Sequence, residues 1–279
     1  MPKKVAYLGP PGTFSEEAAL AYDPTADLLP LGSIPAVASA VEAKMADEGV
    51  VPIENSLEGS VSATVDLLIH ESSLLIRHEL VLPVDHYLLA KPGTDPRRIR
   101  VIFSHPQALA QCRRFIERCF PKAEAVASLS TAAAVEEMLN YPDNAAAAIG
   151  TLRAAELYGA EVLAARIQDH PVNLTRFVVL GLTDHDPTGD DKTSICFAVA
   201  GDDRPGTLVA ALQEFARRQI NLTKIESRPS RQGLGKYIFL ADLQGHRSDP
   251  VVAEALEALR AHCTMIKVFG SYPRFKDDL

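Results

Sequence analysis

Four short segments combine polar side chains with turn-forming residues, a pattern typical of a site for a small polar ligand. In chain order they are GPPGTFS at 9–15, ENS at 54–56, SHPQ at 104–107 and NLTRF at 173–177. Together they offer hydroxyl, amide, carboxylate and guanidinium groups, and an imidazole that can exchange protons near neutral pH. Their spacing shows no Ser-His-Asp triad, metal-ligand pair or dinucleotide fingerprint. The residues alone therefore predict a site for a small anion.

Each segment also has a purely structural explanation. The first one can bind an anion through the free N–H groups of a helix start, or it is a plain turn capped by Thr13 or Ser15. The second offers groups to a polar substrate, or the serines that follow it, Ser60 or Ser62, cap a helix. His105 either exchanges protons or caps a helix. Arg176 either holds a carboxylate through two hydrogen bonds or forms a surface ion pair. The sequence leaves these alternatives open.

The elements that must position these segments alternate between apolar runs and amphipathic stretches. Such alternation predicts parallel strands covered by helices, and residues just beyond the carboxyl ends of the strands face the ligand crevice. So many units favour two α/β lobes around a cleft. We expect strands at 5–8, 28–31, 50–53, 81–90, 100–103, 123–127, 145–149, 162–165 and 175–181, and helices at 14–22, 34–48, 107–120 and 130–140. Pro83 is expected to bend the strand at 81–90.

A second pattern follows the polar stretch at 183–191, which has the composition of a linker. The expected order is a strand, a helix, two strands, a helix and a strand, which is the ferredoxin-like arrangement. A domain this small with exposed sheet edges favours pairing with another copy. We therefore expect a catalytic region over 1–182, a linker over 183–192 and a second domain over 193–272.

The composition excludes several classes of protein. The chain has 279 residues, of which 47% are hydrophobic and 23% charged, so it is not disordered. Its net charge of −8 argues against a general nucleic-acid binder, and no apolar run is long enough for a membrane span. The N-terminus lacks the features of a secretion signal, and the four cysteines form no Cys-x-x-Cys pair. We expect a cytoplasmic protein with reduced thiols and no metal site.

The motifs, taken together and in this order, closely resemble those of prephenate dehydratase. The resemblance rests on GPPGTFS at 9–15, PIENSLEGSV at 52–61, SHPQAL at 104–109 and TRF at 175–177. The C-terminal part resembles an ACT domain, with GTLV at 206–209 and ESRP at 226–229. The implied fold is a two-lobed, periplasmic-binding-protein-like α/β domain with an interlobal cleft, followed by an α+β ferredoxin-like ACT domain. Because the chain begins directly at the first expected strand, we expect the monofunctional form.

The resemblance implies that prephenate loses water and carbon dioxide to give phenylpyruvate, in the pathway to L-phenylalanine. Thr175 would donate a hydrogen bond to the departing ring hydroxyl, and Glu54 and His105 are the candidates to supply its proton. No metal or organic cofactor is expected. Substrate binding would fall to Thr13, Ser15, Asn55, Ser56, Ser104, Gln107, Arg176 and Phe177, with Arg176 and the N–H groups near Thr13 neutralising the carboxylates. A solute-binding protein, an amino-acid sensor and an enzyme acting on arogenate are the alternatives.

The ACT resemblance implies feedback inhibition by L-phenylalanine bound between two paired domains, and hence a homodimer or homotetramer. Thr207 stands where this family usually has alanine, and its extra hydroxyl and methyl would change the affinity for the regulator. Alternatively, the domain only dimerises. One copy would contribute Gly206, Thr207, Leu208 and Val209, and the other Asn221, Glu226, Ser227, Arg228 and Pro229.

Overall fold

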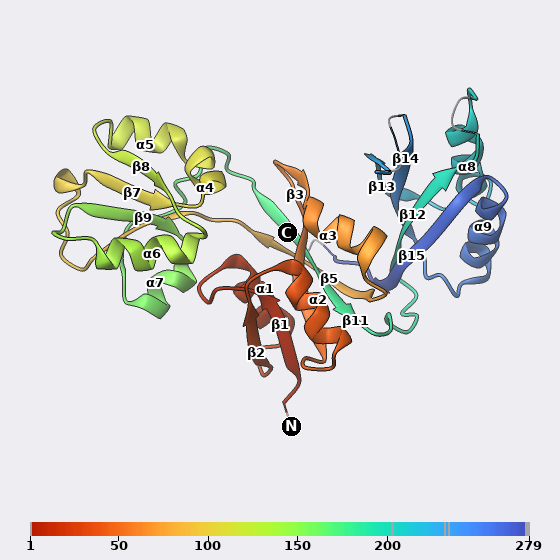
Figure 1. Cartoon of the computed structure of the whole chain (residues 1–279), viewed down its shortest axis with the longest axis horizontal. Coiled ribbons are helices and arrows are strands. Elements are labelled where there is room, and N and C mark those ends of the chain that lie inside the picture. Colours follow the sequence, from red (N-terminus) through yellow and green to blue (C-terminus); the bar gives the residue numbers. More distant parts are fainter. Residues whose placement is uncertain (1, 202–203, 232, 234, 277–279) are drawn as a thin grey trace.

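The computed structural model describes residues 2–201, 204–231, 233 and 235–276 of the chain. These residues form three β-sheets that follow one another along the longest axis of the molecule (Figure 1). Two sheets belong to two α/β lobes, and the third belongs to a C-terminal unit that packs against the first lobe. The predicted fold class is confirmed.

The first lobe is a mixed sheet with the strand order β2-β1-β3-β11-β5, in which β4 also pairs with β3. The first three strands of this order are parallel, whereas β11 runs antiparallel to both of its neighbours. The elements are β1 Lys4–Leu8, α1 Phe14–Tyr22, β2 Asp27–Leu31, α2 Ile34–Glu42, β3 Glu48–Asn55, β4 Gly59–Ser60, α3 Ser62–Asp66, η1 Leu67–Glu71, β5 Leu75–Pro83 and, much later in the chain, β11 Leu174–Gly181.

The second lobe is a sheet with the strand order β10-β6-β9-β7-β8. Small apolar side chains fill its centre, because β9 consists largely of alanine and is buried along its whole length. The elements are β6 Tyr87–Ala90, η2 Pro96–Arg98, β7 Val101–Ser104, α4 Pro106–Gln111, α5 Arg113–Cys119, β8 Glu124–Ala127, α6 Thr131–Asn140, β9 Ala146–Gly150, α7 Leu152–Tyr158 and β10 Glu161–Ala164.

Two extended segments, 84–86 and 165–173, connect the lobes. They run side by side, since the Val84 N–H donates to the carbonyl of Asn173 and the Ile167 N–H donates to the carbonyl of His86. The single strand predicted over 81–90 is therefore wrong, although the bend expected at Pro83 coincides with the end of β5. The chain leaves the first sheet after Pro83 and joins the second sheet at Tyr87.

The single helix predicted over 107–120 is also wrong, because it breaks at Cys112 into α4 and α5. Asp169 from the second connecting segment fills the break. Its N–H donates to the carbonyl of Gln111, and its carboxylate accepts the N–H of Arg114. A group that takes over the backbone hydrogen bonds of a helix is a usual cause of such a kink. The break ties the connecting segment to the helix that carries Gln111.

The helix predicted over 34–48 ends earlier than expected, since α2 stops at Glu42. Lys44 adopts a positive φ of 56°, the left-handed conformation that commonly terminates a helix. The chain then enters β3 at Glu48, two residues before the predicted strand.

The C-terminal unit has the strand order β13-β14-β12-β15, all antiparallel, with two helices on one face. This is the predicted ferredoxin-like arrangement. The segment predicted as a linker lies along the last strand, where the His185 N–H donates to the carbonyl of Ser271. The limits 1–182, 183–192 and 193–272 stay predictions. The elements are β12 Asp191–Val199, α8 Thr207–Ala216, β13 Leu222–Pro229, β14 Tyr237–Gln244, α9 Pro250–Arg260 and β15 Cys263–Pro273.

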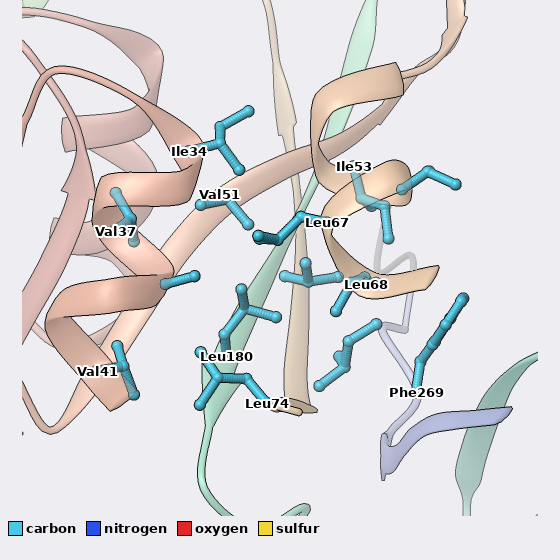
Figure 2. Packing of buried hydrophobic residues seen from close by; sticks show 14 of the residues in the cluster. Ile34, Val37, Val41, Val51, Ile53, Leu67, Leu68, Leu74, Leu180 and Phe269 are labelled. Carbon is cyan, nitrogen blue, oxygen red and sulfur yellow. The ribbon is translucent and has the colours of Figure 1, made fainter. Parts of the chain in front are cut away.

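The other face of this C-terminal sheet shares a hydrophobic core with the first lobe. Phe269 of β15 and Leu240 of β14 belong to the same buried cluster as Leu68 of η1 and Ile76 of β5. Figure 2 shows Phe269 beside the helix that carries Leu68, with side chains of α2 and β11 completing the cluster. The C-terminal unit is thus packed against the first lobe rather than only tethered to it.

None of the helices in the described part of the chain is long and apolar enough to cross a bilayer.

We predict that Gly270→Ala severely destabilises the contact between β15 and the first lobe. A Cβ at this position would lie 2.1 Å from the carbonyl oxygen and 2.8 Å from the nitrogen of Ile76, and both belong to the backbone. Backbone atoms of a paired strand cannot move aside cheaply. We expect a loss of about 3 kcal/mol or more in the free energy of unfolding, measured by chemical denaturation.

Gly189→Ala is the matched control, because Gly189 also has a positive φ but nothing lies within 4 Å of its added Cβ. This substitution should lower the free energy of unfolding by only about 1–2 kcal/mol, the cost of holding an alanine at a positive φ. Equal losses in the two variants would contradict the close packing at Ile76.

Candidate active site

A cavity of about 390 Å³ lies between the two lobes and brings the four predicted segments together. The first lobe contributes residues after β1, at the end of β3 and at the start of β11. The second lobe contributes residues after β7 and β8. Of the predicted site residues, the lining includes Thr13, Ser15, Asn55, His105, Gln107, Thr175 and Phe177.

Three helices begin at this cavity. Thr13 precedes α1, His105 precedes α4 and Ser130 precedes α6, and all three residues line the cavity. The Thr13 hydroxyl donates to the carbonyls of Leu8 and Pro10 and makes no hydrogen bond that caps α1. Helix N-termini carry partial positive charge and free N–H groups. Their convergence makes the cavity attractive to an anion.

Thr175 and Asn55 form the polar centre of the cavity wall in the first lobe. They are paired across β11 and β3, and the Asn55 Nδ2 donates to the Thr175 Oγ1 at 2.9 Å. The Asn55 Oδ1 accepts the N–H groups of Leu57 and Glu58, which fixes the orientation of the amide. Because Thr175 accepts from Asn55, its own O–H remains free to donate.

A hydrogen-bonded group at the connecting segments was not predicted from the sequence. Gln111 at the end of α4 bonds His86, Asn173 and the Glu58 carboxylate, with distances of 2.8, 3.0 and 2.9 Å. It therefore joins the second lobe to both connecting segments and to the first lobe. Its position four residues after Gln107 on one helix face is a signal that sequence reasoning could have used.

His105 combines the two roles that the sequence left open. Its Nδ1 accepts the N–H of Gln107 at 3.3 Å and so caps α4, and the side chain also lines the cavity. Since Nδ1 accepts, the ring proton of the neutral form is on Nε2. Gln107 lines the cavity beside it.

The sequence predicts substrate binding by Ser56, Ser104 and Arg176 and proton supply by Glu54, but none of these four residues lines the cavity. Ser104 is fully buried and donates to the carbonyl of Ile149, so it joins two strands of the second sheet. The Ser56 Oγ accepts the N–H of Leu174. Glu54 directly precedes the cavity residue Asn55 in β3, and Arg176 directly follows the cavity residue Thr175 in β11. Successive side chains of a strand point to opposite faces. Both therefore face the C-terminal domain.

Arg176 is held in a buried ion-pair cluster at this domain contact. Its guanidinium forms an ion pair with Glu79 at 2.7 Å and donates hydrogen bonds to Asp242 at 2.6 Å and to the hydroxyl of Tyr272 at 2.7 Å. Lys192 supplies a second cation, 2.7 Å from Glu79. The cluster joins β11 and β5 of the first lobe to β12, β14 and β15.

The charges of the cluster determine its pKa values. Burial works against the charge on Arg176, but the negative charges of Asp242 and Glu79 outweigh it and raise its pKa well above the usual value. Burial likewise works against ionised Asp242, but Arg176 and the Ser194 hydroxyl hold its pKa below the usual value. Burial raises the pKa of Tyr272, so its phenol stays protonated. The positive charge of Arg176 is thus already neutralised by Asp242 and Glu79 and is not available to a substrate.

Gly12 of the first motif has a role in the contact between the lobes. Its φ is +84°, and an added Cβ would lie 3.2 Å from the Cβ of Ala154 on α7. Its carbonyl accepts from the Thr151 hydroxyl at 2.8 Å, and nearby Glu16 pairs with Arg153. The backbone of this loop therefore lies directly against the second lobe.

The residues predicted to bind L-phenylalanine lie in two places on the C-terminal domain. Gly206 has a φ of +87° and precedes α8, which holds Thr207, Leu208 and Val209. The other group belongs to β13, whose burial alternates. Glu226 and Arg228 face the first lobe, where they contact Ser60 and Asp66. On the opposite face the alternate residues of β13 are exposed, as are Asn221 before the strand, Ser227 and Pro229.

We predict that Arg176→Ala lowers the free energy of unfolding by about 3–5 kcal/mol, since it leaves buried Glu79 and Asp242 without their shared cation. Arg97→Ala is the matched control, because Arg97 forms an exposed ion pair with Asp95 and should change stability by at most about 1 kcal/mol. Chemical denaturation measures both. A stable Arg176→Ala protein whose KM alone had risen would instead support contact with the substrate.

Comparison with known proteins identifies the family. The prephenate dehydratase family model matches residues 5–185, and the ACT domain model matches residues 198–261. A bifunctional chorismate mutase/prephenate dehydratase of Aquifex aeolicus is 43% identical over 272 residues, which cover 97% of this chain and 74% of that protein.

Two solved structures match nearly the whole chain. Prephenate dehydratase of Arthrobacter aurescens in complex with L-Phe has a TM-score of 0.88 at 36% identity, covering 97% of this chain and 90% of that one. GqqA, described as a novel type of quorum quenching acylase, has a TM-score of 0.87 at 30% identity, covering 98% of each chain. With most of its length matched by the family model, the chain belongs to the prephenate dehydratase family of lyases and carries a C-terminal ACT domain.

Proposed function

We propose that prephenate binds in the cavity between the lobes and there loses water and carbon dioxide together to form phenylpyruvate. The observation that carries this assignment is the Thr175 hydroxyl. It lines the cavity, accepts a hydrogen bond from Asn55 and has its own proton free to donate. A donor held in this way can stabilise the negative charge that develops on the departing ring oxygen.

The helix N-termini are suited to hold the two carboxylates of prephenate. Within the described part of the chain, the cavity lining contains neither Lys nor Arg. The starts of α1 and α6 offer free N–H groups and partial positive charge instead, whereas α4 begins with Pro106, which has no N–H, and the Gln107 N–H is accepted by His105. We therefore assign carboxylate binding to the backbone near Thr13 and Ser130, together with the side chains of Ser15 and Gln107.

The proposed reaction moves one electron pair through the ring. The bond from the ring to its carboxylate breaks, carbon dioxide leaves, and the electrons aromatise the ring as the C–O bond to the hydroxyl breaks. Thr175 donates its hydrogen bond to that oxygen, which takes up a proton to leave as water. Among the two titratable candidates, His105 lines the cavity whereas Glu54 is paired with Lys224 at 3.0 Å outside it. His105 in its imidazolium form is therefore the proposed source of the proton, and a ring protonated on Nδ1 would release the Gln107 N–H that it accepts in the neutral form.

An acylase mechanism fits this centre less well. A threonine nucleophile requires a neighbouring base that accepts its proton. Here the side chain next to the Thr175 Oγ1 is the Asn55 amide, which donates. The hydroxyl is arranged as a hydrogen-bond donor rather than as a nucleophile.

We predict that Thr175→Val lowers kcat for phenylpyruvate formation by about 10²–10³-fold, the usual cost of removing one donor to a developing anion. Valine keeps the shape but has no hydroxyl, so the fold and the melting temperature should change little. Thr175→Ser keeps the donor and should retain most of the activity.

The assay follows phenylpyruvate from prephenate at neutral pH, with arogenate as the alternative substrate. A valine variant with wild-type kcat would contradict the role of Thr175. A wild-type protein that only binds prephenate would instead support a solute-binding protein or a sensor.

We also propose that L-phenylalanine inhibits the enzyme through paired ACT domains in a homodimer or homotetramer. The support is the free edge of β13, which within the described chain pairs only with β14. Its outward face includes Ile225, a large hydrophobic residue with 49% of its surface exposed. A second copy placed along this edge would bring the Gly206–Val209 turn of one chain towards β13 of the other. A cytoplasmic location stays a prediction from the sequence.

The inward face of β13 offers a route from the regulatory domain to the cavity. Lys224 bridges Glu54 of the first lobe and Glu226, and Arg228 pairs with Asp66. A ligand that moves β13 must change these contacts, and inhibition requires that it bind the two arrangements unequally.

We predict that Asp66→Asn keeps L-phenylalanine binding but weakens inhibition several-fold, within the usual range of coupling between sites. The change removes the first-lobe partner of Arg228 and leaves the proposed binding residues intact. Calorimetry measures binding, and the prephenate assay measures inhibition. Asp95→Asn, in an exposed pair of the second lobe, is the control. Unchanged wild-type activity at saturating L-phenylalanine would contradict feedback regulation.

A further inference from the structure

His86 is a buried residue of the cavity wall to which no role has been given so far. It lies in the first connecting segment, is only 2% exposed and contacts the edge of Phe14 with ring centroids 5.8 Å apart. Its Nε2 lies 2.8 Å from the Oε1 of Gln111. Its Nδ1 is buried and has no hydrogen-bond partner among the described residues.

The hydrogen bonds around Gln111 determine the direction of the His86 contact. The Gln111 Nε2 donates to the Glu58 carboxylate, which directs Oε1 towards His86. An amide oxygen only accepts, so His86 donates its Nε2–H and keeps the lone pair on Nδ1. Burial lowers the pKa of the ring, although the bond to Gln111 opposes it, and a neutral imidazole fits this arrangement.

The same oxygen continues the chain of hydrogen bonds to Thr175. It also accepts the Asn173 Nδ2 at 3.0 Å, so the Asn173 Oδ1 faces the first lobe and accepts the Asn55 Nδ2 at 2.8 Å. That Nδ2 also donates to the Thr175 Oγ1. Each amide in the chain has one orientation that satisfies its neighbours. The Asn55 amide is held by the Leu57 and Glu58 N–H groups at its oxygen and by Asn173 at its nitrogen. Through Asn173, the Gln111 amide thus helps to fix the Nδ2 group from which the Thr175 hydroxyl accepts.

An imidazole is a poor choice for this position if it serves only packing. A buried ring nitrogen without a partner is unfavourable, and an apolar ring would avoid it. The donor on Nε2 is the property that an apolar ring lacks. Without the His86 Nε2–H, the Gln111 Oε1 would keep only the Asn173 Nδ2 as a donor, and the Gln111 amide would be free to turn.

We propose that His86 is a positioning residue that fixes the Gln111 amide and, through Asn173 and Asn55, directs the Thr175 hydroxyl into the cavity. The inference rests on the proposed function of Thr175 as a donor to the departing oxygen. His86 acts through the chain of amides and needs no contact with the substrate.

The test compares variants that keep or remove the donor at the same place. His86→Gln retains an N–H near the position of Nε2, whereas His86→Asn and His86→Leu cannot reach Gln111. We expect kcat for phenylpyruvate formation to fall about 10–100-fold in the Asn and Leu variants, with KM little changed, and to be largely restored in the Gln variant. His78→Leu is the control, since His78 is a partly buried imidazole of β5 that packs against Tyr22.

A second measurement separates positioning from general destabilisation. If His86 acts through Gln111, adding His86→Leu to Gln111→Leu should lower kcat little further, whereas independent effects would multiply. Multiplying losses, or a folded Asn or Leu variant with wild-type kcat, would overturn the proposal. If Thr175→Val and the His86 variants all keep wild-type kcat, the role of Thr175 fails first. A loss in Thr175→Val alone overturns only the role of His86.

Discussion

The position of β11 in the first sheet is the constraint on which the rest of the molecule depends. Successive side chains of a strand point to opposite faces, so Thr175 and Arg176 cannot serve the same site. Thr175 faces the cavity, and Arg176 enters the ion-pair cluster under the ACT domain. The strand lies between β3 and β5 and is paired along its length with both. One strand thus supplies the polar centre of the catalytic wall and the anchor of the regulatory domain.

This arrangement gives the two domains a short mechanical connection. Asp242 on β14 and Tyr272 on β15 hold Arg176 from the ACT side, and the buried cluster around Phe269 prevents the two sheets from sliding independently. A displacement of the ACT sheet therefore acts on a residue adjacent to Thr175 in the same strand. A buried ion pair is sensitive to such a displacement, since its stability depends on close geometry. The coupling needs no long chain of intermediate residues.

Much of the fold could be predicted because its elements follow local patterns. Turn residues and apolar runs identified most strands of both lobes and the ferredoxin-like order of the C-terminal domain. The connection between the lobes could be predicted only as a bend at Pro83, since the 81–90 stretch is apolar on both sides of its break. The break at Cys112 was equally hidden, because Asp169, which fills it, lies far away in the sequence. Periodicity does not report such distant contacts.

The site is predicted in part, and two of its four errors share a physical cause. A motif read as one unit places Glu54 and Arg176 in the cavity with Asn55 and Thr175. The alternation of a strand would have separated each pair, although it does not say which member faces the ligand. Gln111 lies one helical turn after the predicted residue Gln107, and Asn173 belongs to the NLTRF segment. The contact that His86 makes with this group depends on the two connecting segments lying side by side. The hydrogen-bonded chain is a tertiary feature that no single motif contains.

The exclusion of Arg176 from the cavity also suits the proposed chemistry. In a decarboxylating dehydration, charge leaves the departing carboxylate and develops on the departing hydroxyl oxygen. A full cation beside that carboxylate would stabilise the ground state more than the transition state and would slow the reaction. Helix N-termini, each equivalent to about half a unit charge, can hold the substrate with a smaller penalty of this kind. A neutral hydroxyl donor placed at the other end then interacts most strongly where the charge arrives, so Thr175 gains its effect as the bond breaks.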